Sequence, residues 1–453
     1  MSLKLPDKGQ CFFIGLVMCL VTYYAGSVAV YFFNGKTPLY IWKNFDSMLL
    51  WKIITESNIR TDIRLTAIPS LLSGMVSSLI VPVFIIWQLN KMDVALYGDA
   101  KFASDSDLKK SKLLKWETEN DTDILVGAYK GKYLWYTAPD FVSLGAGTRA
   151  GKGAAIGIPN LLVRKHSLIA LDPKQELWKI TSKVREILLG NKVYLLDPFN
   201  SKTHQFNPLF YIDLKAESGA KDLLKLIEIL FPSYGMTGAE AHFNNLAGQY
   251  WTGLAKLLHF FINYEPSWLN EFGLKPVFSI GSVVDLYSNI DRELILSKRE
   301  ELEETNGLDE NALYHLRDAL TKIREYHETE DEQRSSIDGS FRKKMSLFYL
   351  PTVRKCTDGN DFDLRQLRRE DITVYVGVNA EDISLAYDFL NLFFNFVVEV
   401  TLRENPDFDP TLKHDCLMFL DEFPSIGYMP IIKKGAGYIA GFKLKLLTIY
   451  QNI

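Results

Sequence analysis

A glycine-rich run at residues 145–153, G-A-G-T-R-A-G-K-G, has the composition of a loop that binds the phosphates of a nucleotide. Glycines let backbone N–H groups approach an anion closely, and Lys152 is placed to reach the β- and γ-phosphate oxygens. An apolar run at residues 141–144 predicts a strand before the loop, and residues 151–162 are compatible with a helix after it. The candidate phosphate ligands are Gly147, Thr148, Arg149, Ala150, Gly151, Lys152 and Gly153.

The run departs from the strict phosphate-loop pattern at two positions. Ala146 stands where the pattern has its first glycine, and Gly153 stands where it has a serine or threonine that binds Mg²⁺. An alanine methyl at position 146 is expected to require an adjustment of the backbone. A glycine-rich turn without a ligand is the alternative interpretation when the run is taken alone.

A second candidate site follows the apolar run at residues 416–420, which leads directly into Asp421 and Glu422. Such a run is typical of a buried parallel strand that ends at the catalytic edge of an α/β sheet. In P-loop ATPases the first acid at such a strand end holds Mg²⁺, and the next can polarise the attacking water. Asp421 is therefore the metal candidate and Glu422 the catalytic base candidate. Acids in this position also begin ordinary loops, which is the alternative.

Several short apolar runs that end in polar residues predict a parallel sheet, and helical patterns lie between them. The interval from 214 to 345 differs because its apolar residues recur at helical spacing, as at Tyr250, Leu254, Leu257 and Phe261. The predicted fold class is therefore α/β, with an all-α domain inserted into a P-loop nucleotide-binding domain. The predicted strands lie at residues 141–144, 167–172, 193–197, 373–378, 416–421 and 443–450.

Two stretches near the N-terminus, residues 9–35 and 65–90, contain no charged residue. Each is long enough to cross a bilayer as a helix, so two transmembrane helices are predicted. A cleaved signal peptide is the alternative for the first stretch, but its apolar run is long for that purpose and a second span follows. Lysines outside the two spans favour cytoplasmic termini and a periplasmic loop between the spans. The predicted domains are a membrane anchor at 1–90, a nucleotide-binding domain at 91–213 and 346–453, and the inserted all-α domain at 214–345.

The composition limits the remaining possibilities. A net charge of −4 over 453 residues gives no overall signature of nucleic-acid binding, so any contact with DNA must be local. The four cysteines have no metal-binding spacing, and the seven histidines are scattered along the chain. No chemistry is assigned to any histidine.

Taken in order, these motifs resemble those of the coupling-protein ATPases of type IV secretion and bacterial conjugation. The resemblance implies a RecA-like domain with ATP and Mg²⁺ as cofactors, in which Lys152, Glu422 and Gln451 are catalytic and Asp421 binds the metal. Gln451 stands where the family has a glutamine at a strand end. The other matching segments are L-Y-G-D-A-K-F-A at 96–103, G-T-R-A-G-K-G at 147–153, I-P-N-L-L at 158–162, D-P-K-Q-E at 172–176, F-N-P-L at 206–209 and D-E-F-P at 421–424.

The resemblance also implies a role. The expectation is a multi-pass protein of the bacterial inner membrane, with its ATPase domain in the cytoplasm. It is also expected to assemble into a ring, and a hexamer is the expected ring size. Its expected partners are relaxase-bound single-stranded DNA or effector proteins, and components of the type IV secretion channel that receives them. One alternative is a membrane-tethered translocase for chromosomal or phage DNA. Another is a non-hydrolysing docking receptor with a vestigial nucleotide site.

Two further expectations follow from the resemblance. A ring ATPase needs an arginine from a neighbouring subunit, and Arg354, Arg368 and Arg369 are the candidates. The chain stops two residues after Gln451, where the family's sheet is expected to continue. The sequence is therefore interpreted as a member truncated at its C-terminus, with weak ATPase activity.

Overall fold

The computed structural model describes residues 35–55, 103–118, 123–138, 140–147 and 149–450, together with scattered residues between 13 and 87. It divides into two compact units, residues 1–104 and residues 105–453. Among the described residues, no helix combines the length and the apolar character that crossing a membrane requires. Most of the two predicted spans lies outside these residues, so the spans stay predictions.

The first unit contains two short helices within the predicted periplasmic loop, α2 (Pro38–Asn44) and α3 (Leu49–Thr55). Thr37 caps α2, since its side chain accepts a hydrogen bond from the N–H of Tyr40. An ion pair of 2.6 Å joins Lys52 to Asp46 just before α3. The local sequence therefore accounts for both helices.

The second unit is built on a six-stranded sheet with the order β4-β9-β8-β5-β7-β6. Every neighbouring pair in it is parallel, which confirms the predicted sheet and its six strands. One strand, β9, lies between β4 and β8, so it separates the strand before the glycine-rich loop from the strand before Asp421. The strands are β4 (Val142–Gly145), β5 (Leu168–Leu171), β6 (Lys192–Leu196), β7 (Ile372–Val376), β8 (Cys416–Leu420) and β9 (Leu444–Tyr450).

Both faces of this sheet are buried. Along β8, Leu417 and Phe419 belong to one apolar core, and Met418 and Leu420 belong to the other. This alternation follows from the period of two along a strand and explains the continuous apolar runs in the sequence. The smaller core is completed by residues of α6 (Ile158–Val163) and α7 (Glu176–Ile187).

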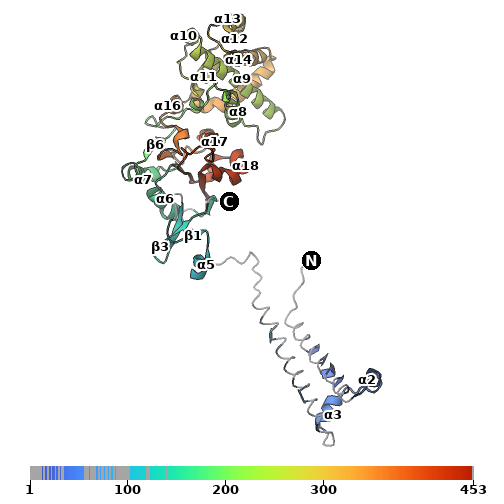
Figure 1. Ribbon diagram of the computed structural model, residues 1–453. Coiled ribbons are helices and arrows are strands. Elements are labelled where there is room, and N and C mark those ends of the chain that lie inside the picture. Colours follow the sequence, from blue (N-terminus) through green and yellow to red (C-terminus); the bar gives the residue numbers. More distant parts are fainter. Residues whose placement is uncertain are drawn as a thin grey trace. The chain divides into compact units, whose positions relative to one another are not determined.

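Between β6 and β7, where every residue is described, the chain forms helices only. Figure 1 shows α9, α11, α12, α13 and α14 gathered into one group. The predicted apolar face is confirmed, because Tyr250, Leu254, Leu257 and Phe261 are all buried in α9. The elements are η2 (Pro208–Tyr211), α8 (Gly219–Leu230), α9 (Gly238–Asn263), α10 (Ser267–Glu271), α11 (Ile280–Asn289), α12 (Arg292–Ser297), α13 (Arg299–Glu303), α14 (Glu310–His327), α15 (Asp331–Met345), η3 (Ser346–Tyr349), α16 (Pro351–Thr357) and η4 (Leu364–Gln366).

The helical segment shares the larger apolar core with the sheet. Trp251 of α9 and Ile169 of β5 belong to the same buried cluster. The division of this unit into domains at residues 213 and 345 stays a prediction. After β7, the chain forms α17 (Tyr387–Leu402), η5 (Phe423–Ile426), α18 (Pro430–Ile439) and η6 (Ala440–Phe442).

A second, antiparallel sheet with the order β1-β3-β2 was not expected from the sequence. Its two longest strands are mostly apolar and aromatic, I-L-V-G-A-Y at residues 124–129 and K-Y-L-W-Y at residues 132–136, and only two residues separate them. Asn160 of α6 joins this sheet to the rest of the unit, because its side-chain amide exchanges two hydrogen bonds of 2.7 and 2.8 Å with the backbone of Leu125. The elements here are α5 (Asp105–Lys110), β1 (Leu114–Lys115), β2 (Ile124–Tyr129) and β3 (Lys132–Tyr136).

Candidate nucleotide-binding site

The glycine-rich loop leaves the carboxyl end of β4 and enters a helix. Arg149 and Gly151 adopt left-handed backbone conformations, with φ of 61° and 77°. This geometry explains a glycine at position 151, where a side chain would be strained. Ala146 has no positive φ, and its N–H donates to the carbonyl of Tyr450 at 3.1 Å. Ala146 therefore has a backbone conformation that a residue other than glycine adopts without strain.

The helix after the loop begins with a π-helical turn, η1 (Gly153–Gly157), before it continues as α6. The N–H of Ile158 bonds to the carbonyl of Gly153, which is the i to i+5 pattern of a π-helix. Such turns are frequent at functional sites. Lys152 lies directly before this turn, so the irregular turn sets the position of its backbone.

The structure leaves two buried charged atoms of this region without a hydrogen-bond partner among the described residues. One is Nζ of Lys152 and the other is Oδ1 of Asp421. Buried polar atoms in proteins are nearly always hydrogen-bonded, so an unpaired ammonium and an unpaired carboxylate oxygen at one site call for a ligand.

The electrostatics show that the two residues share an environment. Burial raises the pKa of Asp421 above its ordinary value, and the nearby charges of Lys152 and Lys174 oppose that shift. The glycine-rich loop after β4 and the acidic pair after β8 are therefore brought together, as the sequence predicts for this pair of motifs.

The segment after β5 contributes residues to which the sequence reasoning gave no role. Burial raises the pKa of Asp172, and the charge of Asp421 raises it further. One oxygen of Asp172 accepts a hydrogen bond of 2.8 Å from the N–H of Trp178, which places Asp172 at the start of α7. Lys174 and Glu176 both influence the pKa of Asp421. The D-P-K-Q-E motif at the end of a strand was the available signal for these residues.

Three non-glycine residues with positive φ follow three strands of the sheet at this edge: Arg149 after β4, Gln175 after β5 and Glu422 after β8. The φ of Glu422 is 67°, and its carbonyl accepts hydrogen bonds from the N–H and the side chain of Ser425 at 2.9 and 2.7 Å. A strained backbone held by its surroundings is typical of functional sites.

Two predicted site residues, Thr148 and Gln451, lie outside the described residues. Tyr450, which precedes Gln451, pairs in register with Gly145 at the ends of β9 and β4. The ring of Tyr450 also packs edge-on against Phe423, with the ring centres 5.6 Å apart. The end of β9 is therefore held between the glycine-rich loop and the segment that follows Glu422.

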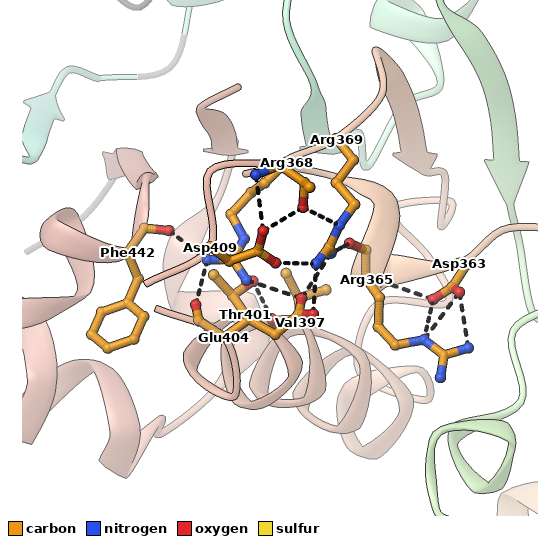
Figure 2. Close-up of polar contacts among 10 residues, drawn as sticks. Asp363, Arg365, Arg368, Arg369, Val397, Thr401, Glu404, Asp409 and Phe442 are labelled. Carbon is orange, nitrogen blue, oxygen red and sulfur yellow. Dashed lines mark hydrogen bonds and ion pairs between the residues drawn. The ribbon is translucent and has the colours of Figure 1, made fainter. Parts of the chain in front are cut away.

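The three candidate arginines are all held within the chain. Arg354 contacts Asp285 and donates to the carbonyl of Gly281 at 2.8 Å. The side chain of Arg368 is only 3% exposed. Figure 2 shows Arg368 and Arg369 beside Glu404 and Asp409. Among their contacts are those from Arg368 Nη1 to the carbonyls of Glu404 (2.8 Å) and Phe442 (3.1 Å), and from Arg369 to Glu404 (2.7 and 2.9 Å) and Asp409 (2.8 Å).

Comparison with known proteins gives consistent results. The conjugal transfer protein TraG of Escherichia coli is 24% identical over 478 residues, which cover all of this chain and 72% of TraG. The protein VirD4 of Rhizobium radiobacter is 28% identical over 71% of this chain and 43% of VirD4. Among solved structures, the bacterial conjugative coupling protein TrwBdeltaN70 aligns with a TM-score of 0.49 at 15% identity, over 77% of this chain and 68% of that one.

A family model described as type IV secretory system conjugative DNA transfer matches residues 101–453. This match covers most of the chain and includes every predicted site residue. The chain therefore belongs to the conjugative DNA transfer family of type IV secretory systems.

Proposed function

We propose that this chain is an ATP-binding coupling protein whose nucleotide site lies at the carboxyl edge of the six-stranded sheet. The observation that carries the proposal is the pair of buried, unpartnered atoms, Lys152 Nζ and Asp421 Oδ1. A nucleoside triphosphate with Mg²⁺ fits this donor set, because phosphate oxygens satisfy an ammonium and the metal satisfies a carboxylate oxygen.

Each residue then has a distinct task. Lys152 neutralises charge on the β- and γ-phosphates, and the backbone N–H groups of residues 147–153 surround the phosphates. Asp421 would hold the metal, since Gly153 offers no hydroxyl for it. Glu422 orients and polarises the attacking water. Bound Mg²⁺ supplies electrostatic stabilisation of the phosphates.

The wider role rests on family membership and on the named relatives. We propose a bacterial inner-membrane protein that recruits relaxase-bound DNA or effector proteins and delivers them to a type IV secretion channel as a ring, with a hexamer as the working assumption. The chain spans 72% of its TraG relative and 43% of its VirD4 relative. The activity of the whole relatives is therefore proposed, and not established, for this chain.

Binding of a fluorescent ATP analogue to the full chain in detergent tests the nucleotide site. Lys152→Ala removes a charge-assisted contact with phosphate, so we expect an affinity loss of about ten- to a hundredfold. The matched control is Lys183→Ala, which removes an exposed lysine from α7. Equal binding by the parent and Lys152→Ala would refute the site. Tight ATP binding without any phosphate release would instead favour the docking receptor.

Cysteine labelling in intact cells tests the membrane topology separately. A cysteine at Ser47, which lies between α2 and α3, is expected to react with a membrane-impermeant reagent. A cysteine at Ser104 is expected to react only after the cells are opened. The reverse pattern would place the nucleotide site outside the cytoplasm, away from ATP, and would contradict the proposed function.

A further inference from the structure

Two histidines and one aspartate meet at the edge of the sheet opposite to the nucleotide site. His166 precedes β5, Asp371 precedes β7 and His414 precedes β8. These strands are neighbours in the order β8-β5-β7 and run parallel, so their starting residues lie at one edge. The three residues are far apart in the sequence, which is why scattered histidines gave no signal.

The side chains are spaced like the ligands of a metal ion. One potential ligand atom from each residue lies within 4.8 Å of the other two. Asp371 Oδ1 is 3.0 Å from His166 Nδ1 and 4.0 Å from His414 Nδ1. Ligands at about 2.0–2.1 Å from a tetrahedral zinc ion lie roughly 3.3 Å from one another, which falls between these two distances. The imidazole rings of His166 and His414 also pack against each other, with ring centres 4.4 Å apart and a tilt of 35°.

Hydrogen bonds fix the backbones of all three residues, so the ligand set is largely preorganised. The loops before β5 and β7 are also joined directly, because Ser167 Oγ donates to the carbonyl of Glu370 at 2.7 Å and accepts from the N–H of Ile372 at 2.9 Å. The backbone contacts of the three residues are His166 O with Arg185 Nη2 (2.9 Å), Asp371 O with Lys192 N (2.9 Å) and His414 N with Arg368 O (3.0 Å).

The ligand types select the class of metal. Two imidazoles and one carboxylate suit Zn²⁺, Co²⁺ or Ni²⁺, whereas Mg²⁺ and Ca²⁺ prefer sites made of oxygen ligands. The side chains of His166, Asp371 and His414 are 16%, 19% and 24% exposed, so the cluster is partly buried but open on one side. A water molecule can therefore complete a four-coordinate site.

Positive charges next to the cluster oppose metal binding. Lys165 and Lys413 directly precede His166 and His414 in the sequence. Their charges repel a divalent cation, so only moderate affinity is expected.

We propose that His166, Asp371 and His414 form a binding site for a transition-metal ion of the zinc class. The site joins the starting points of three adjacent strands, so its role is structural. It lies at the amino edge of the sheet, whereas Lys152 and Asp421 lie at the carboxyl edge. The proposal is therefore independent of nucleotide binding.

Metal titration of the full chain, purified without a polyhistidine tag and stripped with a chelator, tests the site. Without nucleotide present, the parent is expected to bind about one equivalent of Co²⁺ with a visible absorption band, and Zn²⁺ is expected to displace it. His414→Ala and the more conservative His166→Gln are each expected to weaken binding at least tenfold. His242→Ala is the matched control, since it removes an exposed histidine of α9.

Two results would overturn the proposal. One is the absence of stoichiometric Co²⁺ or Zn²⁺ binding by the parent, and the other is unchanged binding in the His166→Gln variant. X-ray absorption spectroscopy of the zinc-loaded parent does not depend on how the variants fold. It is expected to show two imidazole ligands, and a sulfur ligand or a shell without imidazole would equally reject the site.

Discussion

Gly157 and Phe419 lie so close together that a Cβ atom on Gly157 would be 3.0 Å from Cζ of Phe419. Gly157 ends the π-helical turn that starts after Lys152, and Phe419 lies in β8, two residues before Asp421. This contact therefore limits how closely the helix after Lys152 can approach the strand that leads to Asp421, the two residues proposed to bind phosphate and metal. The side chain of Phe419 is fully buried, so it has little room to move.

Gly157→Ala is expected to lower the free energy of unfolding by about 1–2 kcal/mol, because the added methyl group overpacks the contact with Phe419. The affinity for an ATP analogue should fall as well, since the shift displaces Lys152. Gly339→Ala is the control, because Gly339 lies in α15 with nothing within 4 Å of an added Cβ. It should raise stability by about 0.5–1 kcal/mol through helix propensity. Urea denaturation measures the free energy of unfolding of both variants. Equal changes in the two variants would show that the contact between Gly157 and Phe419 is not tightly packed.

The sequence predicted the sheet because its four inner strands, β5, β7, β8 and β9, are buried on both faces and so appear as continuous apolar runs. It also predicted the meeting of Lys152 and Asp421, since loops at the carboxyl ends of parallel strands converge. The π-helical turn was not predictable, because Gly153 and Gly157 are compatible with several helical forms. The antiparallel sheet was missed although its signal was present, because the apolar run Ile124–Tyr129 and the aromatic run Lys132–Tyr136 are separated by a two-residue turn that ends in Gly131.

Glu422→Gln should preserve nucleotide binding and lower phosphate release at least about a hundredfold, because an amide cannot polarise the attacking water. Glu186→Gln, at an exposed position of α7, controls for a simple loss of negative charge. A single-turnover assay with labelled ATP separates binding from chemistry. Phosphate release at the parental rate would remove Glu422 from the mechanism and leave its backbone conformation as a purely structural feature.

The pH dependence of stability tests the environment of Asp421. Burial raises the pKa of this carboxyl above its ordinary value of 3.8, so the folded state holds the proton more tightly than the unfolded state. The raised pKa stabilises the folded state fully below pH 3.8, and this stabilisation is lost as the pH rises through the pKa of the folded state. Asp421→Asn, which mimics the neutral form, is therefore expected to be more stable than the parent at pH 7.

The advantage of Asp421→Asn should shrink as the pH is lowered towards 4, because the parental carboxyl then becomes protonated. Thermal unfolding of the parent and the variant at pH 7 and near pH 4, without nucleotide or Mg²⁺, measures this difference in stability. The same variant should lose Mg²⁺-dependent affinity for the nucleotide at pH 7. A destabilised variant at pH 7 would show that the attraction between Asp421 and Lys152 exceeds the cost of burying the carboxylate.

The histidine cluster shows what one sequence cannot reveal. His166 and His414 are separated by most of the nucleotide-binding unit, and only the sheet order β8-β5-β7 brings them together. The arginines are a second example. Arg368 and Arg369 have the appearance of surface residues in a charged segment, but both contact Glu404, which lies at least 35 residues away in the sequence.

Arg368→Ala is expected to lower the free energy of unfolding by about 2–3 kcal/mol, because it leaves the carbonyls of Glu404 and Phe442 without their donor in a buried region. Arg365→Ala is the matched control. The side chain of Arg365 is 44% exposed and pairs with Asp363 only two residues away, so its loss should cost less than about 1 kcal/mol. Chemical denaturation measures the stability of both variants.

An arginine that acts on a neighbouring subunit would give the opposite pattern, with parental stability and a loss of ATP turnover confined to the assembled ring. If Arg368→Ala behaves in that way, the buried contacts of Arg368 do not describe its state in the assembly, and Arg368 is favoured over Arg354 and Arg369 as the arginine finger.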